Sequence, residues 1–376
     1  MRALPPGSTI GVLGGGQLGR MLALAAIPMG YRVHVLDPSP ECAARPVAER
    51  CVTAAFESAE GAADLARGVD LVTIEIEKIG AEALSAATRH APLRPSAEVL
   101  LMVQDRARQK TWLQAAGFPV GPFRIAANAG ELAAALESLA GPCLVKAARG
   151  GYDGRGQVEA VTGESDRAWS ELRAVAVTVE LKLSLDAELS VLVARRPGGQ
   201  VAVYPPALNH HEDGILAWSV LPAPLPESVL REARELGVAI AAALRVEGLL
   251  AIELFLVDGR LLVNELAPRP HNSFHATLDN GATSQFEQAI RAICDLPLGE
   301  VVPARPAAIH NLLGEIWSGP AEPDFAAALE VQPVRLHLYG KGEPRPGRKM
   351  GHLAATGATP NQALTRVVEA HRRLRR

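Results

Sequence analysis

Residues 253–265 read Glu253-Leu-Phe-Leu-Val-Asp-Gly-Arg-Leu-Leu-Val-Asn-Glu265, and they are the most informative stretch of this 376-residue sequence. Two apolar runs flank Asp258-Gly259, a dipeptide that favours the tight turn of a β-hairpin. If the loop has three residues, 258–260, then Glu253 lies directly opposite Glu265 on one face of the hairpin. A two-residue loop instead puts the two acids on opposite faces, because side chains alternate along a strand.

Paired carboxylates on neighbouring strands predict a cation site. Cβ atoms of directly opposed residues lie ~4.5–5.5 Å apart, so two acids there share a proton or a cation. Hard oxygen ligands without Cys or His between them suit Mg²⁺ that is shared with substrate phosphates. The alternative is a surface hairpin with two solvated acids. It is disfavoured because the apolar residues Ile252, Leu254 and Leu266 surround Glu253 and Glu265.

Composition excludes several classes of protein. The sequence is 48% hydrophobic and 21% charged with a net charge of −3, which gives no electrostatic footprint for nucleic acid or an anionic membrane. No apolar run reaches the ~18–20 residues of a membrane span, and the first residues lack a secretory leader pattern. Four cysteines without C-x-x-C spacing are typical of reduced thiols. We therefore expect a cytoplasmic enzyme with no nucleic-acid or membrane partner.

The first hundred residues follow a β-α-β pattern. A buried strand at residues 9–13 precedes Gly14-Gly-Gly-Gln-Leu-Gly19, a helix, and a strand at residues 32–37, which predicts a parallel sheet. The glycines match G-x-G-x-x-G, and Asp37 ends the second strand where an acid would hold a ribose. A dinucleotide site is one interpretation. Backbone contact with a simpler anion, or a tight turn without a ligand, are the others.

Two acids, Glu75 and Glu77, stand at the carboxyl end of a predicted strand at residues 69–75. In open α/β sheets that end faces the ligand crevice, and a spacing of two places both side chains on one face. Each acid is suited to a substrate amine or hydroxyl, and capping a helix is the alternative role for either one.

Cations and glycines in the middle of the sequence predict a nucleotide site. Asp105 is a suitable N-cap for a helix that carries Arg106 and Lys110 on one face, where they meet phosphate or solvent. Lys146 ends an apolar strand, and a buried ammonium group needs a partner such as a phosphate. The glycine-rich residues 149–157 follow at once, and their backbone amides can cover phosphates. The pattern is not that of a P-loop. A strand running into a linker at residues 175–183 can read an adenine edge through its backbone.

Two further segments of the sequence are rich in polar residues. The turn at residues 341–352 holds four cations among Pro and Gly, which favours a phosphate monoester over a solvated hairpin. Residues 209–214 read Asn-His-His-Glu-Asp-Gly and are expected to form a polar turn. Four consecutive side chains cannot all reach one ion, so metal binding is not expected there.

Several segments together resemble the N5-carboxyaminoimidazole ribonucleotide synthetases, enzymes of the ATP-grasp superfamily. The resemblance is carried by the following segments: Gly14-Gly-Gly-Gln-Leu-Gly-Arg-Met, Gln104-Asp-Arg, Gly150-Gly-Tyr-Asp-Gly-Arg-Gly-Gln, Asp213-Gly-Ile, Asn264-Glu-Leu-Ala-Pro-Arg-Pro-His-Asn-Ser, Thr283-Ser-Gln-Phe-Glu-Gln and Pro346-Gly-Arg-Lys-Met-Gly-His. It implies an α/β fold, α+β in part. A Rossmann-like parallel-sheet domain is expected at residues 1–104, an ATP-grasp domain at 105–300 (lobes 105–178 and 179–300), and a small C-terminal lobe at 301–376.

The resemblance also implies a reaction. ATP, bicarbonate and 5-aminoimidazole ribonucleotide would give N5-carboxyaminoimidazole ribonucleotide, ADP and phosphate through carboxyphosphate, with Mg²⁺ as cofactor and a homodimer as the assembly. Residues expected to hold ATP are Arg106, Lys146, Gly151, Tyr152, Asp153, Gly154, Arg155, Gly156, Gln157, Glu180, Leu181, Lys182, Leu183, Glu188, His211, Asn264 and Glu265. The expected metal ligands are Glu253 and Glu265. Residues expected to hold the ribonucleotide are Gln17, Leu18, Glu75, Asn272, Lys341, Arg348 and Lys349. Residues expected around bicarbonate and carboxyphosphate are Tyr152, Asp153, Arg155, Arg269 and His271, with Asp153 as a proton acceptor.

Two alternatives remain at this point. A formate-dependent glycinamide ribonucleotide transformylase is a related ATP-grasp enzyme that activates formate instead of bicarbonate. A non-catalytic dinucleotide-binding module, built on residues 14–19 and Asp37, is the second. It leaves Lys146, the glycine-rich loop and the paired acids without a role.

Overall fold

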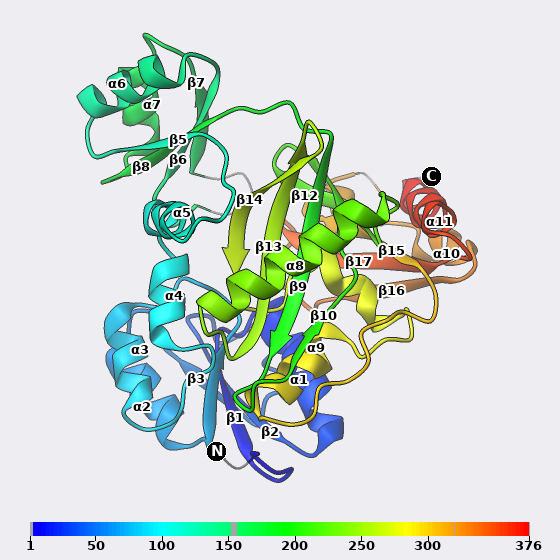
Figure 1. Cartoon of the computed structure of the whole chain (residues 1–376). Helices are drawn as coiled ribbons and strands as arrows, with labels where there is room; N and C mark the ends of the chain where they lie inside the picture. Colours follow the sequence, from blue (N-terminus) through cyan, green and yellow to red (C-terminus); the bar gives the residue numbers. More distant parts are fainter. Residues whose placement is uncertain (1–2, 152–155, 320, 376) are drawn as a thin grey trace.

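The computed structural model describes residues 3–151, 156–319 and 321–375, which fold into three sheets with helices around them (Figure 1). The first sheet has four parallel strands in the order β3-β2-β1-β4. Its strands are β1 (Thr9–Leu13), β2 (Arg32–Asp37), β3 (Arg50–Thr53) and β4 (Leu71–Ile74). The predicted Rossmann-like parallel sheet is thus confirmed.

Helices connect and cover these strands. They are α1 (Gln17–Ala26), η1 (Ile27–Met29), α2 (Ala59–Arg67), α3 (Ala81–Thr88) and α4 (Ala97–Val103). Small and aliphatic side chains of α2 and α3 pack with those of β1, β2 and β4 in one buried cluster that includes Leu13, Leu65 and Ile74. The helix α4 was not predicted from the sequence, although the Ser96 hydroxyl caps it by accepting a hydrogen bond from the Val99 N–H.

The second sheet is small and antiparallel, in the order β5-β8-β6-β7. Its strands are β5 (Phe123–Ala126), β6 (Cys143–Ala147), β7 (Gln157–Ala160) and β8 (Val177–Leu181), and its helices are α6 (Ala129–Leu139) and α7 (Ser165–Leu172). In Figure 1 this small-sheet lobe stands at the upper left, and α5 (Arg106–Ala115) lies directly below it. As predicted, the Asp105 side chain caps α5.

The third sheet has nine strands, in the order β14-β13-β9-β11-β12-β15-β17-β16, with β10 paired to β9. The strands are β9 (Ala187–Arg195), β10 (Val201–Val203), β11 (Ala207–Glu212), β12 (Ile215–Leu221), β13 (Gly248–Val257), β14 (Arg260–Ala267), β15 (Ala307–Leu313), β16 (Val334–Leu338) and β17 (Lys349–Thr356). The helical elements beside them are α8 (Glu227–Ala243), η2 (Asn272–Leu278), α9 (Gln285–Ile293), η3 (Gly314–Trp317), α10 (Phe325–Leu329) and α11 (Pro360–Arg373). Because β12 pairs with β15, the strands after residue 300 extend the same sheet. The division into domains at residues 104 and 300 stays a prediction.

One local prediction about this sheet was wrong. Residues 209–212 belong to β11, and only Asp213 and Gly214, both with positive φ, form the turn to β12. The segment resembles a turn because its polar side chains, from Asn209 to Glu212, lie on both faces of β11, and only Asn209 of these is buried.

The predicted loop length of the β13–β14 hairpin was also wrong. Val257 pairs with Arg260, so the loop has the two residues Asp258 and Gly259, both with positive φ. A shift in register then skips Asn264 and restores Glu253 opposite Glu265. The bulge at Asn264 therefore produces the facing acids that the sequence analysis ascribed to a longer loop.

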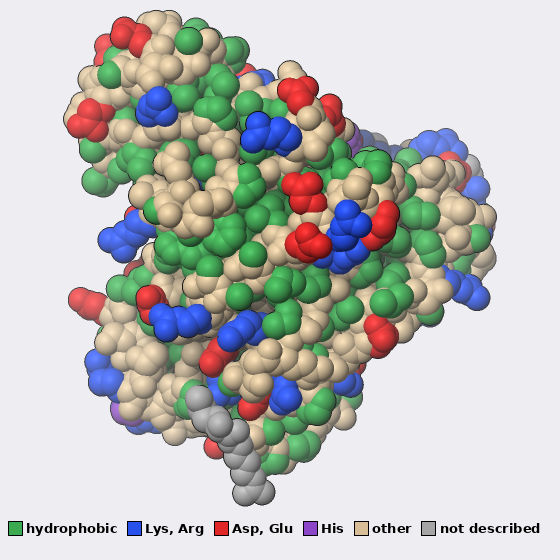
Figure 2. Space-filling model, in the orientation of Figure 1, with side chains coloured by type: hydrophobic (Ala, Val, Ile, Leu, Met, Phe, Trp, Pro, Cys, Tyr) green, Lys and Arg blue, Asp and Glu red, His purple; other side chains and the backbone are tan. Residues whose placement is uncertain are grey.

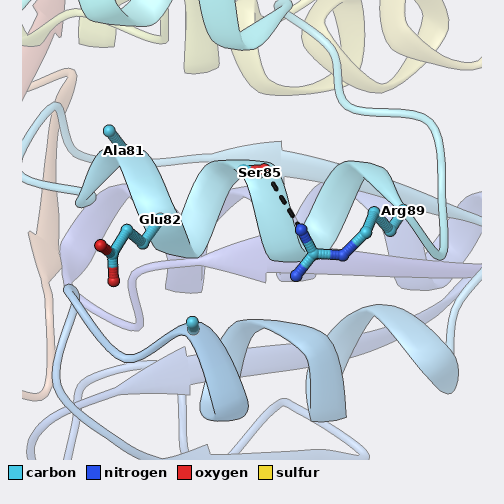
Figure 3. A pocket seen from close by; sticks show the side chains of 5 residues that line it. Ala81, Glu82, Ser85 and Arg89 are labelled. Carbon is cyan, nitrogen blue, oxygen red and sulfur yellow. Dashed lines mark hydrogen bonds between the residues drawn. The ribbon is translucent and has the colours of Figure 1, made fainter.

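The surface matches the near-neutral composition. On the face shown in Figure 2, basic and acidic side chains are interspersed rather than gathered by sign. None of the helices in the described ranges is long and apolar enough to cross a membrane. A groove of about 400 Å³ between α2 and α3 is lined by Ala59, Ala81, Glu82, Ser85 and Arg89. Figure 3 shows Arg89 donating a hydrogen bond to Ser85 there. No predicted site residue lines this groove.

Candidate active site

The paired acids of the hairpin form the centre of the site. The Oε1 atom of Glu253 lies 3.2 Å from Nε2 of His271, and its Oε2 atom accepts a hydrogen bond of 3.2 Å from the Asn264 amide. Burial opposes ionisation of Glu253, but His271, His211 and Asn264 outweigh it and lower the pKa to about 2. Glu253 is therefore ionised throughout the neutral range.

Glu265 behaves in the opposite way. Partial burial raises the pKa of its carboxyl group, Arg106 opposes that shift at 3.7 Å, and the charge on Glu253 adds to it. The Glu265 side chain is still 46% exposed, so it faces open space rather than the core. A cation bound between the two acids would relieve their repulsion, which makes the pair chemically suited to a divalent metal with oxygen ligands.

A second charged cluster joins α5 to the small-sheet lobe. The Oε2 atom of Glu180 lies 3.1 Å from Nζ of Lys146 and 3.2 Å from Nζ of Lys110, and Thr178 donates a hydrogen bond to Oε1. Burial opposes the charge on Glu180, but the two lysines outweigh it and lower its pKa to about 2. Burial lowers the pKa of Lys110, and Glu180 opposes this effect.

The ends of the glycine-rich loop are fixed on adjacent strands. Lys146 of β6 pairs with Gln157 of β7, and the Ala147 N–H donates to the carbonyl oxygen of Gly156. Arg106 donates to the carbonyl oxygens of Ala147 and Gly151 at 3.2 and 2.8 Å. The strands on either side of the loop, β6 and β7, are thus paired next to Lys146, the predicted phosphate-binding lysine. The predicted residues Tyr152, Asp153, Gly154 and Arg155 lie outside the described residues.

The predicted adenine linker continues from β8. The backbone N–H groups of Leu181 and Lys182 donate to the carbonyl oxygens of Pro122 and Pro142, and Lys182 forms an ion pair of 2.5 Å with Glu159. Leu183 is partly buried just after the strand. These contacts hold the linker between its neighbouring strands.

A further ion pair lies on the nine-stranded sheet. Glu188 of β9 contacts His211 of β11, with 2.7 Å between Oε2 and Nδ1. Burial opposes the charge on this histidine, but Glu188 and Glu253 outweigh it and raise the His211 pKa. Both residues were predicted to hold ATP, and the structure brings them to the side of the nine-stranded sheet that carries Glu253.

Residues far apart in the sequence meet at the predicted ribonucleotide site. Lys341 donates a hydrogen bond to the side chain of Gln17, at the start of α1, and another of 2.7 Å to the backbone oxygen of Lys349. Arg348 donates to the Glu343 carbonyl oxygen at 2.7 Å, and Leu18 is buried in the core below. The cationic turn after β16 therefore faces the glycine-rich turn of the parallel sheet.

Glu75 fills the anion position of that glycine-rich turn. Its carboxylate accepts hydrogen bonds from the N–H groups of Gly16 at 2.7 Å and Gly19 at 2.6 Å, at the N-terminus of α1. A Cβ atom on Gly14 would lie 2.3 Å from the Glu75 side chain, so the glycine makes room for this acid. Asp37 likewise accepts a hydrogen bond from the Gly15 N–H. The fingerprint is thus explained by internal carboxylates, without a dinucleotide pyrophosphate.

The segment after β14, residues 269–272, contacts one of the paired acids and one of the acids that follow β4. Nε of Arg269 lies 2.7 Å from Oε1 of Glu77. Burial opposes the charge on Arg269, but Glu77, Glu75 and Glu265 outweigh it and raise its pKa. Arg269 therefore interacts electrostatically with Glu265 of the paired acids and with Glu75, which fills the glycine-rich turn before α1.

Asn272 and His271 complete this segment. Asn272 is 7% exposed, and neither polar atom of its amide has a hydrogen-bond partner among the described residues. Such a group is costly to bury alone, and its amide has donors and an acceptor with which to bind a ligand. His271 is oriented by Ser273, whose hydroxyl lies 2.8 Å from Nδ1.

Three residues at the site were not assigned from the sequence. Lys110 was considered only as a phosphate or solvent contact, and Glu77 was left without a specific partner. Gln285 of α9 hydrogen bonds through its side chain to both the N–H and the carbonyl oxygen of His271, at 2.8 and 2.9 Å. Its place in the motif Thr283-Ser-Gln was the available signal, but periodicity alone could not show which element α9 faces.

Comparisons with known proteins agree with this geometry. Residues 8–104 match the ribonucleotide synthetase preATP-grasp domain, residues 111–286 the ATP-grasp domain, and residues 307–366 the phosphoribosylaminoimidazole carboxylase C-terminal domain. The N5-carboxyaminoimidazole ribonucleotide synthase of Bacillus subtilis (strain 168) is 42% identical over 351 residues, which cover 93% of this chain and 91% of the relative.

Solved structures of similar proteins superimpose on nearly the whole chain. The ADP complex of an N5-carboxyaminoimidazole ribonucleotide synthetase superimposes with a TM-score of 0.92 at 38% identity, covering 99% of this chain and 98% of the other. The synthase of Aspergillus clavatus, in complex with ADP and 5-aminoimidazole ribonucleotide, gives a TM-score of 0.88 at 30% identity and covers 98% and 99%.

Proposed function

This chain belongs to the N5-carboxyaminoimidazole ribonucleotide synthase family, and from that premise we propose that it joins bicarbonate to 5-aminoimidazole ribonucleotide at the expense of ATP. It is an ATP-grasp ligase of purine biosynthesis. The observation that carries the assignment to this site is the facing pair Glu253 and Glu265, placed beside Lys146 and Arg106 within a chain that matches the family over its whole length. The dinucleotide-binding alternative loses its support because Glu75 fills the glycine-rich turn.

ATP would lie between the small-sheet lobe and the hairpin. Lys146 and Arg106 supply positive charge for its phosphates, and the glycine-rich loop that follows Lys146 would cover them. Glu180 and the linker through Leu183 would meet the adenosine part, while Glu188, His211 and Asn264 would line the opposite wall. Covering the phosphates also excludes water, which would otherwise hydrolyse carboxyphosphate.

Glu253 and Glu265 fit a magnesium ion. The two carboxylates face each other and Glu253 is held ionised. Burial and, to a smaller extent, the charge on Glu253 raise the pKa of Glu265, and a cation would favour its ionised form. When bound with ATP, the ion would neutralise charge on the phosphate oxygens. The protein's own contribution is to hold the two acids at this spacing through the bulge at Asn264.

The ribonucleotide would bind between α1 and the turn before β17. Lys341, Arg348 and Lys349 supply charge for its 5′-phosphate, and Gln17 is oriented by Lys341. The amide of Asn272 would gain partners from the ligand, which explains its otherwise costly burial. Glu75 and Leu18 would form the floor of this pocket.

The chemistry takes place between these two substrates. A bicarbonate oxygen attacks the γ-phosphorus of ATP, releasing ADP and forming carboxyphosphate. The exocyclic amine of the ribonucleotide then attacks the carboxyl carbon, inorganic phosphate leaves, and the amine loses a proton. Arg269 and His271 would surround the small acid, together with Tyr152, Asp153 and Arg155. We propose Asp153 as the proton acceptor. Asp153→Asn should keep ATP binding and abolish turnover, and unchanged turnover would eliminate that role.

We further propose that the chain acts in the cytoplasm as a homodimer. Sedimentation of the purified chain tests the assembly directly, because the dimer doubles the mass of 39.7 kDa.

Phosphate release from ATP tests the activity. We expect release with bicarbonate to rise when 5-aminoimidazole ribonucleotide is added, and N5-carboxyaminoimidazole ribonucleotide to appear in equal amount. Formate with glycinamide ribonucleotide serves as the matched control. Release with that pair and none with bicarbonate would assign the transformylase reaction instead.

A further inference from the structure

A buried lysine outside the predicted site shares the carboxylate of Glu180. Lys110 lies on α5 and is 4% exposed, and its Nζ atom is 3.2 Å from the Oε2 atom of Glu180. Lys146 reaches the same oxygen from β6 at 3.1 Å. One carboxylate oxygen is therefore held between two ammonium groups, of which only Lys146 adjoins the glycine-rich loop.

The charge of this cluster depends on the second lysine. A carboxylate paired with one lysine has no net charge, which would leave little attraction for the phosphates of a nucleotide. With Lys110 present, the two lysines and Glu180 together carry one net positive charge. If Lys146 were the one lysine beside Glu180, the carboxylate would thus neutralise the positive charge that the phosphates need.

Lys110 is placed to act through Glu180 rather than on the nucleotide. Its Nζ atom donates a second hydrogen bond, of 3.4 Å, to the carbonyl oxygen of Val263 on β14. Its partners and its burial leave it facing the protein, whereas the Lys146 side chain is 13% exposed at the end of β6. The neighbouring position on the same helix face, Arg106, contacts Glu265 and the loop residue Gly151.

We propose that Lys110 is a positioning residue for ATP: it neutralises Glu180 so that the charge of Lys146 stays available to the phosphates. This role rests on the proposed function, since it requires ATP in this cleft. It differs from a purely structural role, in which Lys110 would only tie α5 to β14 through Val263. The two roles predict different dependence on the number of phosphates in the ligand.

Calorimetric titration of the full chain with ATP, ADP and adenosine separates them. Lys110→Gln keeps hydrogen-bond donors but removes the charge, so the ratio of ATP affinity to adenosine affinity should fall about tenfold, as expected for one charge lost several ångströms from a phosphate. ADP should lose less, and adenosine should be unaffected. Lys110→Arg should retain the ratio of the unaltered chain.

The matched control is Arg108→Gln on the same helix, because the Arg108 side chain is 63% exposed and contacts only Asp105 among the ion pairs of the described residues. Its ratio should be unchanged. Equal weakening of ATP and adenosine by Lys110→Gln would overturn the proposal in favour of a structural tie. An unchanged ratio would overturn it as well.

A second variant covers the case in which Lys110→Gln does not fold. Glu180→Gln removes the acid that competes for Lys146, so it should raise the ratio of ATP to adenosine affinity, even if both affinities change through the adenine contact. The double variant Lys110→Gln/Glu180→Gln restores the net charge and should restore the ratio. A ratio that falls or stays constant in Glu180→Gln overturns the proposal. Failure of the unaltered chain to bind ATP would overturn the proposed function itself.

Discussion

Glu265 lies directly opposite Glu253 in the register of β13 and β14, yet the pKa values of the two carboxyl groups shift in opposite directions. Glu253 is held ionised by His271 and Asn264, while Glu265 carries the cost of the second charge. Without a bound cation, the two carboxylates repel each other, and the charge on Glu253 contributes to the raised pKa of Glu265.

Replacing either acid of the pair should remove magnesium-dependent turnover. We expect Glu253→Gln and Glu265→Gln each to lower kcat/KM by roughly 10²-fold or more, because charge neutralisation at the phosphates is lost. Phosphate release measured across a magnesium titration checks this. Glu287→Gln, which removes an acid paired with Arg291 on α9, is the control and should leave the activity unchanged. A normal magnesium dependence in both active-site variants would contradict the metal assignment.

The cationic turn should control ribonucleotide affinity alone. Lys341→Met and Arg348→Met are each expected to raise the KM for 5-aminoimidazole ribonucleotide about tenfold or more, with the KM for ATP unchanged, since one phosphate contact is lost. Arg345→Met on the same turn is the matched control, because its side chain is 68% exposed and contacts Glu343. Equal effects of all three substitutions would indicate a diffuse charge effect instead of a defined phosphate site.

Substitution of Asn272 should weaken ribonucleotide binding without lowering the stability of the fold. Asn272→Leu removes two buried polar atoms that lack partners among the described residues, so the free energy of unfolding should stay constant or rise by about 1 kcal/mol. Ribonucleotide affinity should fall in the same variant. Urea denaturation and steady-state kinetics measure the two effects. A marked loss of stability would show that the amide already has a structural partner.

Glu180 should make the stability of the chain depend on acid pH. Its pKa in the folded protein is about 2, against an ordinary value of 4.5. The ionised group therefore stabilises the folded state above about pH 4.5, and this contribution, on the order of 3 kcal/mol, is lost as the pH falls through 2. Urea denaturation between pH 6 and pH 2 should show a shallower decline for Glu180→Gln. Parallel pH profiles would contradict the buried lysine–glutamate cluster.

The carboxylate of Glu75 should stabilise the parallel sheet as well as the substrate pocket. It accepts hydrogen bonds from Gly16 and Gly19 at the start of α1, so Glu75→Ala should lower the free energy of unfolding by about 1–3 kcal/mol. Denaturation of the apo protein is the measurement. The exposed acid Glu41 offers the control substitution Glu41→Ala, which should have little effect on stability. A loss of ribonucleotide affinity with unaltered stability would limit Glu75 to a binding role.

Short-range patterns predicted most of the elements that hold the site. The turn around Asp258-Gly259, the cap at Asp105 and the strand that carries Lys146 are local features that the sequence predicted, although the hairpin loop is one residue shorter than predicted and β6 ends one residue later, at Ala147. The bulge at Asn264 could not be predicted, because the choice between loop lengths depends on how β14 meets the rest of the sheet. The prediction that Glu253 faces Glu265 is therefore correct, although it was inferred from a three-residue loop and results from the bulge instead.

Features that depend on distant partners were harder to infer. The roles of Lys110 and Gln285 require knowing that α5 lies against β8 and that α9 lies against the segment after β14. The glycine-rich turn was open to several readings because the acid that fills it, Glu75, is almost sixty positions away in the sequence. Contacts between polar residues that are distant in the sequence produce no periodic pattern in either segment.

The continuous nine-stranded sheet has a mechanical consequence. Glu253 on β13 and Lys349 on β17 belong to one hydrogen-bonded framework, whereas Lys146 belongs to the separate small sheet. Opening or closing of the small-sheet lobe would change how tightly a nucleotide is enclosed, yet leave the distance between the proposed metal site and the proposed ribonucleotide site unchanged. The enzyme could therefore exchange nucleotide repeatedly without having to realign the molecule that receives the carboxyl group.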